Sequence, residues 1–96
     1  MSQQAQPDFN ALERRARIHF ESREFSEALA IYYYMADGDP SLDAGYLGMR
    51  IGACYEALGY LRAAKYWYGR AVDENPTIPE YVEARRRLEK AIAGAP

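Results

Sequence analysis

Apolar residues recur at spacings of three and four along most of the chain, and charged residues occupy many of the positions between them. This is the period of an α-helix that buries one face. Five segments follow this period, near residues 9–22, 24–37, 42–58, 61–74 and 79–91. The pattern therefore predicts an all-α fold of five short helices joined by tight turns.

Residues that favour helix ends stand between these segments. Asp8 and Ser41 are candidate N-caps, because a short polar side chain can accept a hydrogen bond from a free backbone N–H group. Gly38 is expected just beyond the second helix, and Gly59 just beyond the third. Residues 77–80, Thr-Ile-Pro-Glu, resemble a capping box with a proline in the first turn of the fifth helix.

The helical segments also repeat along the chain. A shift of 36 residues places the first helical pair on the second. Identical residues then coincide at five positions: Arg14 on Arg50, Ala28 on Ala64, Tyr32 on Tyr68, Asp37 on Asp73, and Pro40 on Pro76. An internal period of this length is typical of stacked helical repeats.

The second of these units resembles a tetratricopeptide repeat (TPR). The family pattern combines small residues, aromatic rings, a glycine in the middle of the repeat and a closing proline. This unit supplies them all, at Ile51, Gly52, Tyr55, Gly59, Ala64, Tyr68, Ala71 and Pro76. The first unit departs from the pattern at Arg15, His19 and Arg23, which stand where an apolar residue, an aromatic ring and a glycine are usual.

The resemblance implies one TPR-like domain in which helix–turn–helix units stack into a superhelix. Its parts are a first repeat at about residues 8–40, a second at about 41–76 and a capping helix at about 77–93. Residues 1–7 are expected to form a disordered tail, because they are polar and end in a proline, and residues 94–96 a short C-terminal tail.

Composition narrows the function. The chain has 96 residues, which is enough for one domain, and its net charge of −2 gives no general attraction to nucleic acid or to an anionic membrane. No apolar stretch approaches the roughly 18 residues that a membrane span needs, and the N-terminus does not read as a signal peptide. A cytoplasmic protein is therefore the expectation.

The sequence offers little catalytic or metal-binding chemistry. Cys54 and His19 are single residues of their kind, so no metal site is expected at either. Cys54 is interpreted as a buried small residue or, alternatively, as a reactive thiol. No glycine-rich phosphate loop and no nucleophile–base pair is visible, so we expect neither a cofactor nor an enzyme.

The resemblance also implies where a partner would bind. In such a stack the first helix of each unit lines a concave groove that holds a peptide or helix of another protein. The groove positions it implies are Asn10, Glu13, Arg14, Arg17, Tyr46, Met49, Arg50, Ala53 and Arg86.

Two features of this groove have alternative interpretations. Arg14, Arg50 and Arg86 share one repeat position. They form either a ladder that binds an acidic segment or a terminal carboxylate, or surface ion pairs with neighbouring glutamates. Tyr46 and Met49 either receive an apolar anchor of the partner or pack against a neighbouring helix.

Two functions follow from these patterns. The leading hypothesis is a non-catalytic adaptor that binds a protein partner, with an acidic segment as one option. The alternative is a scaffold that assembles with copies of itself, because tyrosine and tryptophan are favoured in interfaces. The aromatic runs at residues 32–34 and 66–68 carry that alternative.

Overall fold

The computed structural model describes residues 8–95, and this part of the chain is all-helical. The predicted five helices are confirmed: α1 (Phe9–Glu21), α2 (Phe25–Ala36), α3 (Tyr46–Ala57), α4 (Leu61–Glu74) and α5 (Pro79–Ala93). The tail expected at residues 1–7 lies outside the described residues, as does residue 96 of the expected C-terminal tail.

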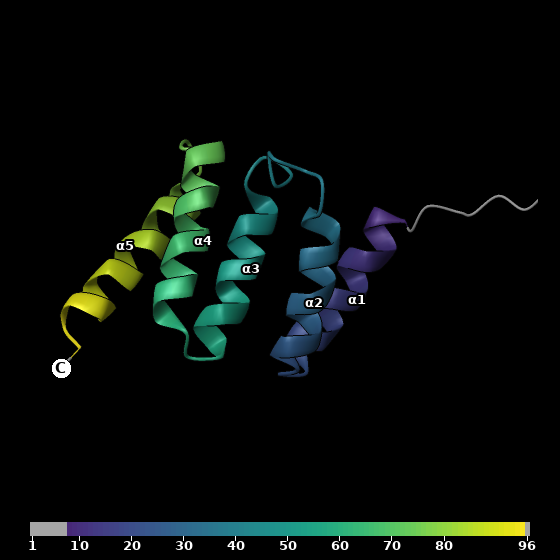
Figure 1. Cartoon of the computed structure of the whole chain (residues 1–96), viewed down its shortest axis with the longest axis horizontal. Coiled ribbons are helices and arrows are strands. Elements are labelled where there is room, and N and C mark those ends of the chain that lie inside the picture. The colour runs from purple at the N-terminus through teal and green to yellow at the C-terminus, as the bar shows by residue number, and fades with distance from the viewer. Residues whose placement is uncertain (1–7, 96) are drawn as a thin grey trace, which may run out of the picture.

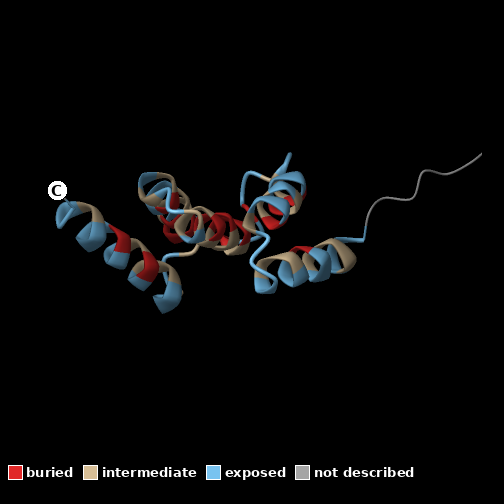
Figure 2. Ribbon diagram, turned by 90° about the horizontal axis from the view of Figure 1, so that it is seen from below, coloured by how far each residue is buried: buried red, intermediate tan, exposed pale blue. Residues whose placement is uncertain are grey.

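Each helix packs on the next one along the chain, and the helices run alternately up and down (Figure 1). Viewed along the helices, α1 and α5 lie to one side and α2 and α4 to the other, with α3 between them (Figure 2). The helices thus form an arch. We call the side bordered by α1, α3 and α5 the inner face, and the side formed by α2, α4 and the adjoining edge of α5 the outer face.

Small residues and aromatic rings alternate in the core, as the sequence pattern predicts. The ring of Tyr68 is buried against α3 at a glycine, since a Cβ atom on Gly52 would lie 2.6 Å from the Tyr68 ring. The buried residues form two clusters. One joins the first repeat to α3 and comprises Ala16, Ala28, Tyr32, Met35, Leu42, Leu47, Ile51 and Cys54. The other joins α4 to α5 and comprises Ala64, Tyr68, Ala84 and Leu88.

The turn inside each repeat ends its first helix in the same way. Gly59 has a φ of 90°, and its N–H donates to the carbonyl of Glu56, while the N–H of Tyr60 donates to that of Tyr55. Such a pair of bonds around a left-handed residue is the Schellman motif. The predicted stop at Gly59 is confirmed, and Gly38 likewise follows the end of α2 with a φ of 78°.

The predicted start of the third helix is wrong. Ser41 does not cap it, because α3 begins only at Tyr46 and the four preceding residues, 42–45, have φ values of 54°, 53°, 53° and 91°. Asp39 organises this left-handed turn: its carboxylate accepts from the Ser41 N–H (3.1 Å), the Ser41 hydroxyl (2.8 Å) and the Asp43 N–H (2.9 Å). Leu42 matched the helical period because its side chain is buried, although its backbone is not helical.

The capping box expected before the fifth helix is also absent. Ile78 occupies the N-cap position of α5 and makes no side-chain cap bond, and the Thr77 hydroxyl donates to Asn75 Oδ1 instead (3.1 Å). Pro79 does stand in the first turn, where its missing N–H costs nothing. The proline was thus the informative residue of the motif. At the start of α1, Asp8 accepts from the Asn10 N–H (3.0 Å), which confirms it as the N-cap.

Candidate protein-binding surface

The α3 helix runs along the middle of the inner face. Met49 and Arg50 are three and four residues after Tyr46, and Ala53 is four and three residues after them, so the four residues share a side of the helix. Tyr46 and Arg50 both reach residues of α1, which places this side of α3 next to α1. The four predicted α3 residues are therefore adjacent, with different neighbours.

Glu13 of α1 is the centre of a polar network at the junction with α3. Its Oε2 atom accepts from the Tyr46 hydroxyl (2.6 Å) and from Arg17 Nη2 (2.8 Å). Partial burial alone would raise the pKa of Glu13, but these two hydrogen bonds outweigh it and hold the pKa below its ordinary value. Burial and the bond to Glu13 raise the pKa of Tyr46 to about 12. The network therefore keeps its charges at neutral pH.

Arg50 is held between the two helices of the first repeat. Its guanidinium carbon lies 4.7 Å from the ring centre of Phe20 on α1 and 5.4 Å from that of Tyr32 on α2. Its Nε–H group donates to the Tyr32 hydroxyl (3.1 Å). Stacked cation–π contacts of this kind fix an arginine in place. Arg50 therefore joins α3 to the first repeat and is not a freely extended charge.

A second network joins α3 to α5. Glu56 accepts from Arg87 Nη2 (2.7 Å) and Nε (3.3 Å), and from the Tyr68 hydroxyl (2.7 Å). Burial works against ionisation of Glu56, but the bonds from Arg87 and Tyr68 lower its pKa overall. A bidentate arginine fixes both the distance and the orientation of the two helices.

Sequence reasoning missed Arg87. The 36-residue shift aligns Arg86 with Arg50, so the predicted groove includes Arg86 of α5 and not Arg87. Ala84 and Leu88 are the buried positions of α5, and Arg87 directly precedes Leu88 and reaches Glu56 of α3, whereas Arg86 pairs with Glu83 of its own helix. The spacing of the apolar residues in α5 was the signal that could have identified Arg87.

The remaining predicted positions are dispersed. Asn10 and Arg14 are exposed on α1, and Ala53 is half-buried at the middle of the face. Arg86 pairs with Glu83 of its own helix (3.1 Å), and Met49 packs against the cluster around Tyr68. Arg14, Arg50 and Arg86 thus have three different environments, and Met49 takes the packing role that was one of its two interpretations.

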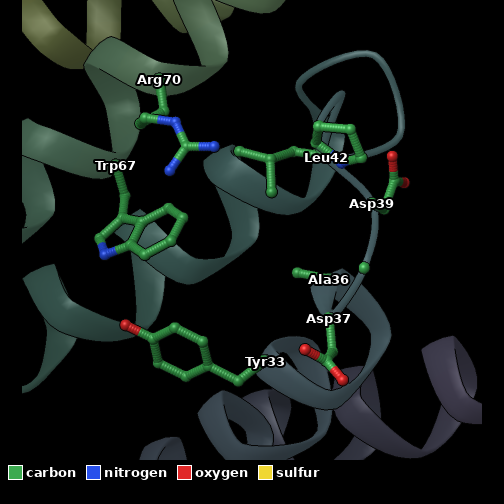
Figure 3. Close-up of a pocket in the computed structure, with 9 residues that line it drawn as sticks. Tyr33, Ala36, Asp37, Asp39, Leu42, Trp67 and Arg70 are labelled. Atoms are coloured by element: carbon green, nitrogen blue, oxygen red, sulfur yellow. The ribbon is translucent and has the colours of Figure 1, made fainter.

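The aromatic residues gather on the outer face, between α2 and α4. Tyr33 contacts Trp67 edge-on (centroids 5.5 Å apart) and shares a hydrogen bond with Tyr55 (2.8 Å between hydroxyl oxygens). Beside them a pocket of about 440 Å³ lies between α2, the turn after it and α4. Figure 3 shows the Trp67 ring and the Arg70 guanidinium on one side of this pocket, and Leu42 and Ala36 on the other.

The two side chains with other chemical potential are the Cys54 thiol, which is buried, and the His19 imidazole, which contacts a carboxylate. Burial raises the pKa of the Cys54 thiol to about 11, so it carries no thiolate at neutral pH. His19 Nδ1 lies 2.7 Å from Glu24 Oε1. Within residues 8–95, no three His, Cys, Asp or Glu side chains come together as a metal-ion site. None of the helices in this range has the length and apolar character that crossing a membrane requires.

Comparison with known proteins adds no relative to this picture. No protein-family model, no curated protein and no solved structure matches the chain.

Proposed function

We propose that this chain is a TPR-type adaptor that binds another polypeptide non-covalently on its inner face. The observation that carries the proposal is the arch of Figure 2, in which the first helix of each unit and α5 border one side while α2 and α4 lie on the other. A curved row of helices offers an extended concave surface to a partner. The cytoplasmic location expected from the sequence belongs to the same proposal.

The cross-helix contacts support this role because they fix the surface before a partner arrives. The Glu13–Tyr46 bond joins α1 to α3, and the Glu56–Arg87 pair joins α3 to α5. A surface that is already ordered loses little conformational freedom on binding. Arg50 and Met49 shape this surface from within and are not the residues that contact the partner.

The partner-contacting positions are then the exposed ones. Arg14 is exposed, and Arg17 keeps about half of its side chain in water while it pairs with Glu13. Ala53 leaves room at the middle of α3. A helix or an extended segment with acidic residues complements this arrangement, since arginine binds carboxylates in a bidentate manner.

The test is a capture experiment with two matched double variants of the tagged chain. Arg14→Glu with Ala53→Glu places two acidic groups on the inner face. Arg15→Glu with Ala30→Glu makes the same changes at exposed positions of α1 and α2. We expect the first variant to lose a captured partner by roughly tenfold or more, as at an interface hot spot, and the second to retain it.

Equal capture by both variants would remove the inner face as the binding surface. Circular dichroism melts of both variants show whether a loss of partner capture is due to unfolding.

A further inference from the structure

Gly69 is a helix-interior glycine that the packing of the chain does not require. Cβ atoms on Gly48 and Gly52 would approach Trp67 O to 3.1 Å and the Tyr68 ring to 2.6 Å, so those two glycines make room for α4. A Cβ atom on Gly69 would meet only Arg85 Cδ, at 3.8 Å, which is an ordinary contact. Glycine is among the poorest residues inside a helix. Its presence at 69 therefore has no internal explanation.

Gly69 lies in the floor of a second outer-face pocket, of about 490 Å³, between α4 and α5. Arg62, Lys65 and Arg70 of α4 and Arg85 of α5 line this pocket. The acidic residues that line it are Asp73 and Glu89. Cations thus outnumber acids here by four to two, in a chain whose net charge is −2.

These α4 cations have no ionic partner in the part of the chain that the structure describes. Within residues 8–95, no carboxylate lies within 4 Å of the charged nitrogens of Arg62, Lys65 or Arg70. Arg85 reaches Glu89 only at 4.0 Å. By contrast, Arg17, Arg86 and Arg87 all pair with glutamates at 3.1 Å or less.

Arg70, which lines both this pocket and the 440 Å³ pocket between α2 and α4, is also held in a fixed position. Its guanidinium carbon lies 5.2 Å from the Trp67 ring centre and 6.0 Å from that of Tyr66. Its Nη1 atom lies 3.5 Å from the Tyr66 hydroxyl. Figure 3 shows the guanidinium extending away from α4 above the Trp67 ring. An arginine fixed by aromatic rings, with free N–H donors, is well suited to bind a carboxylate.

We propose that the outer face around Gly69 is a second binding site, which takes an acidic polypeptide segment. The main chain of the segment approaches α4 at Gly69, where no side chain stands in the way, and its carboxylates pair with Arg62, Lys65 and Arg70. Glycine commonly marks a place where another chain approaches a backbone closely. The excess of positive charge in the pocket favours an acidic ligand, because carboxylates can form ion pairs with the cations that have none.

This site is separate from the inner face. Its cations come from α4 and α5, whereas the residues proposed to contact a partner on the inner face come from α1 and α3. The inference therefore does not depend on the adaptor role of the inner face.

The test uses the single tryptophan of the chain. Trp67 lies directly beneath Arg70, so its fluorescence reports on a carboxylate that binds there. We would titrate the full chain with an acetylated and amidated hexaglutamate peptide, and with its hexaglutamine counterpart. We expect hexaglutamate to change the Trp67 emission with saturation at low salt and less at high salt, and hexaglutamine to have no effect.

Gly69→Leu distinguishes binding from folding. Leucine is a better helix former, and its Cβ atom would meet only Arg85 Cδ, at 3.8 Å. We therefore expect the midpoint of thermal unfolding to rise or stay unchanged. Affinity for hexaglutamate should fall roughly tenfold or more, because the side chain separates the carboxylates from their donors. Arg62→Gln should weaken binding as well.

Arg15→Gln is the matched control, because it removes one exposed cation from α1 at a position outside both proposed binding surfaces. We expect it to retain binding. Equal affinity of Gly69→Leu and the unaltered chain for hexaglutamate would overturn the proposal. So would equal loss in Arg15→Gln and Arg62→Gln, which would indicate attraction to overall charge alone. Tighter binding of a single-stranded oligothymidine than of hexaglutamate in the same titration would overturn it too, by identifying a nucleic-acid site.

Discussion

The two helical repeats reach the same local geometry with different residues. In the first repeat Arg23 has a φ of 64°, and its N–H and that of Glu24 donate to the carbonyls of Phe20 and His19. The second repeat makes the same pair of bonds around Gly59. An arginine in this conformation costs roughly 1–2 kcal/mol that a glycine does not. The turn is therefore imposed by the packing of α1 on α2, and its residue type adjusts only the cost.

The polar partners of the two buried tyrosines differ more. Tyr32 and Tyr68 are both almost fully buried, 36 residues apart. Arg50 donates to the hydroxyl of Tyr32, whereas the hydroxyl of Tyr68 donates to Glu56. The repeat position thus determines that a ring is buried, but not what its hydroxyl binds: the partner of Tyr32 lies on the helix after it, and the partner of Tyr68 on the helix before it.

The largest effect is expected at the contact between α3 and α4. Gly52→Ala would place a methyl group 2.6 Å from the ring of Tyr68, which is buried and has no room to move. We expect overpacking to lower the free energy of unfolding by about 1–3 kcal/mol. Urea denaturation followed by circular dichroism measures it.

Gly69→Ala is the matched control, since it makes the same change in a helix interior without a close contact. It should leave the free energy of unfolding unchanged or raise it by up to about 1 kcal/mol. Equal destabilisation by both substitutions would show that the close contact with Tyr68 does not make position 52 more sensitive than position 69.

The two turns give the next largest effect. Gly59→Ala introduces a Cβ atom at a φ of 90°, and we expect a loss of about 1–2 kcal/mol in the free energy of unfolding. Arg23→Gly removes the same strain from the first repeat and should stabilise the chain by up to about 1 kcal/mol, less the cation–π contact of Arg23 with Phe25. Thermal melts of the pair measure both. Changes of the same sign would contradict the shared geometry of the turns.

The hydroxyl partners predict a smaller difference. Tyr68→Phe removes a hydrogen bond to a carboxylate that also orients Arg87, and should cost about 1 kcal/mol. Tyr32→Phe leaves Arg50 stacked between two rings and partly exposed to water, so about 0.5 kcal/mol is expected. Chemical denaturation of both variants measures the order. A larger cost for Tyr32→Phe would reverse the roles assigned to the two junctions.

Local residue patterns predicted the helices well and the polar contacts poorly. The period of apolar residues located all five helices, because burial of one face is the main determinant of helix position here. It failed at residues 42–45. The side chain of Leu42 is buried there, but its backbone belongs to a left-handed turn that Asp39 stabilises. A helical period reports directly which side chains are buried, so a buried residue in a turn next to a helix can extend the predicted helix beyond its true start.

The candidate site shows a further limit of the sequence. Glu13, Arg17, Tyr46 and Arg50 were chosen from repeat positions, and the structure brings all four to the junction of α1 with α3. The pairing of Glu56 with Arg87 joins residues 31 positions apart on separate helices, so it depends on how α5 is rotated against α3. A one-residue difference in that rotation exchanges Arg86 for Arg87, and a repeat shift cannot resolve it.

The smallest effect concerns acid stability at the two junctions. The pKa values of Glu13 and Glu56 are lower in the folded chain than their ordinary value of 4.5. A carboxylate with a lowered pKa stabilises the fold fully above its unfolded pKa, and this contribution is lost as the pH falls through the folded value. The free energy of unfolding should therefore decline below about pH 4.5. Glu13→Gln and Glu56→Gln should each lower stability at pH 7 and flatten that decline, which denaturant titrations between pH 7 and pH 3 measure. If one substitution leaves the slope unchanged, the corresponding junction holds through packing and not through its carboxylate.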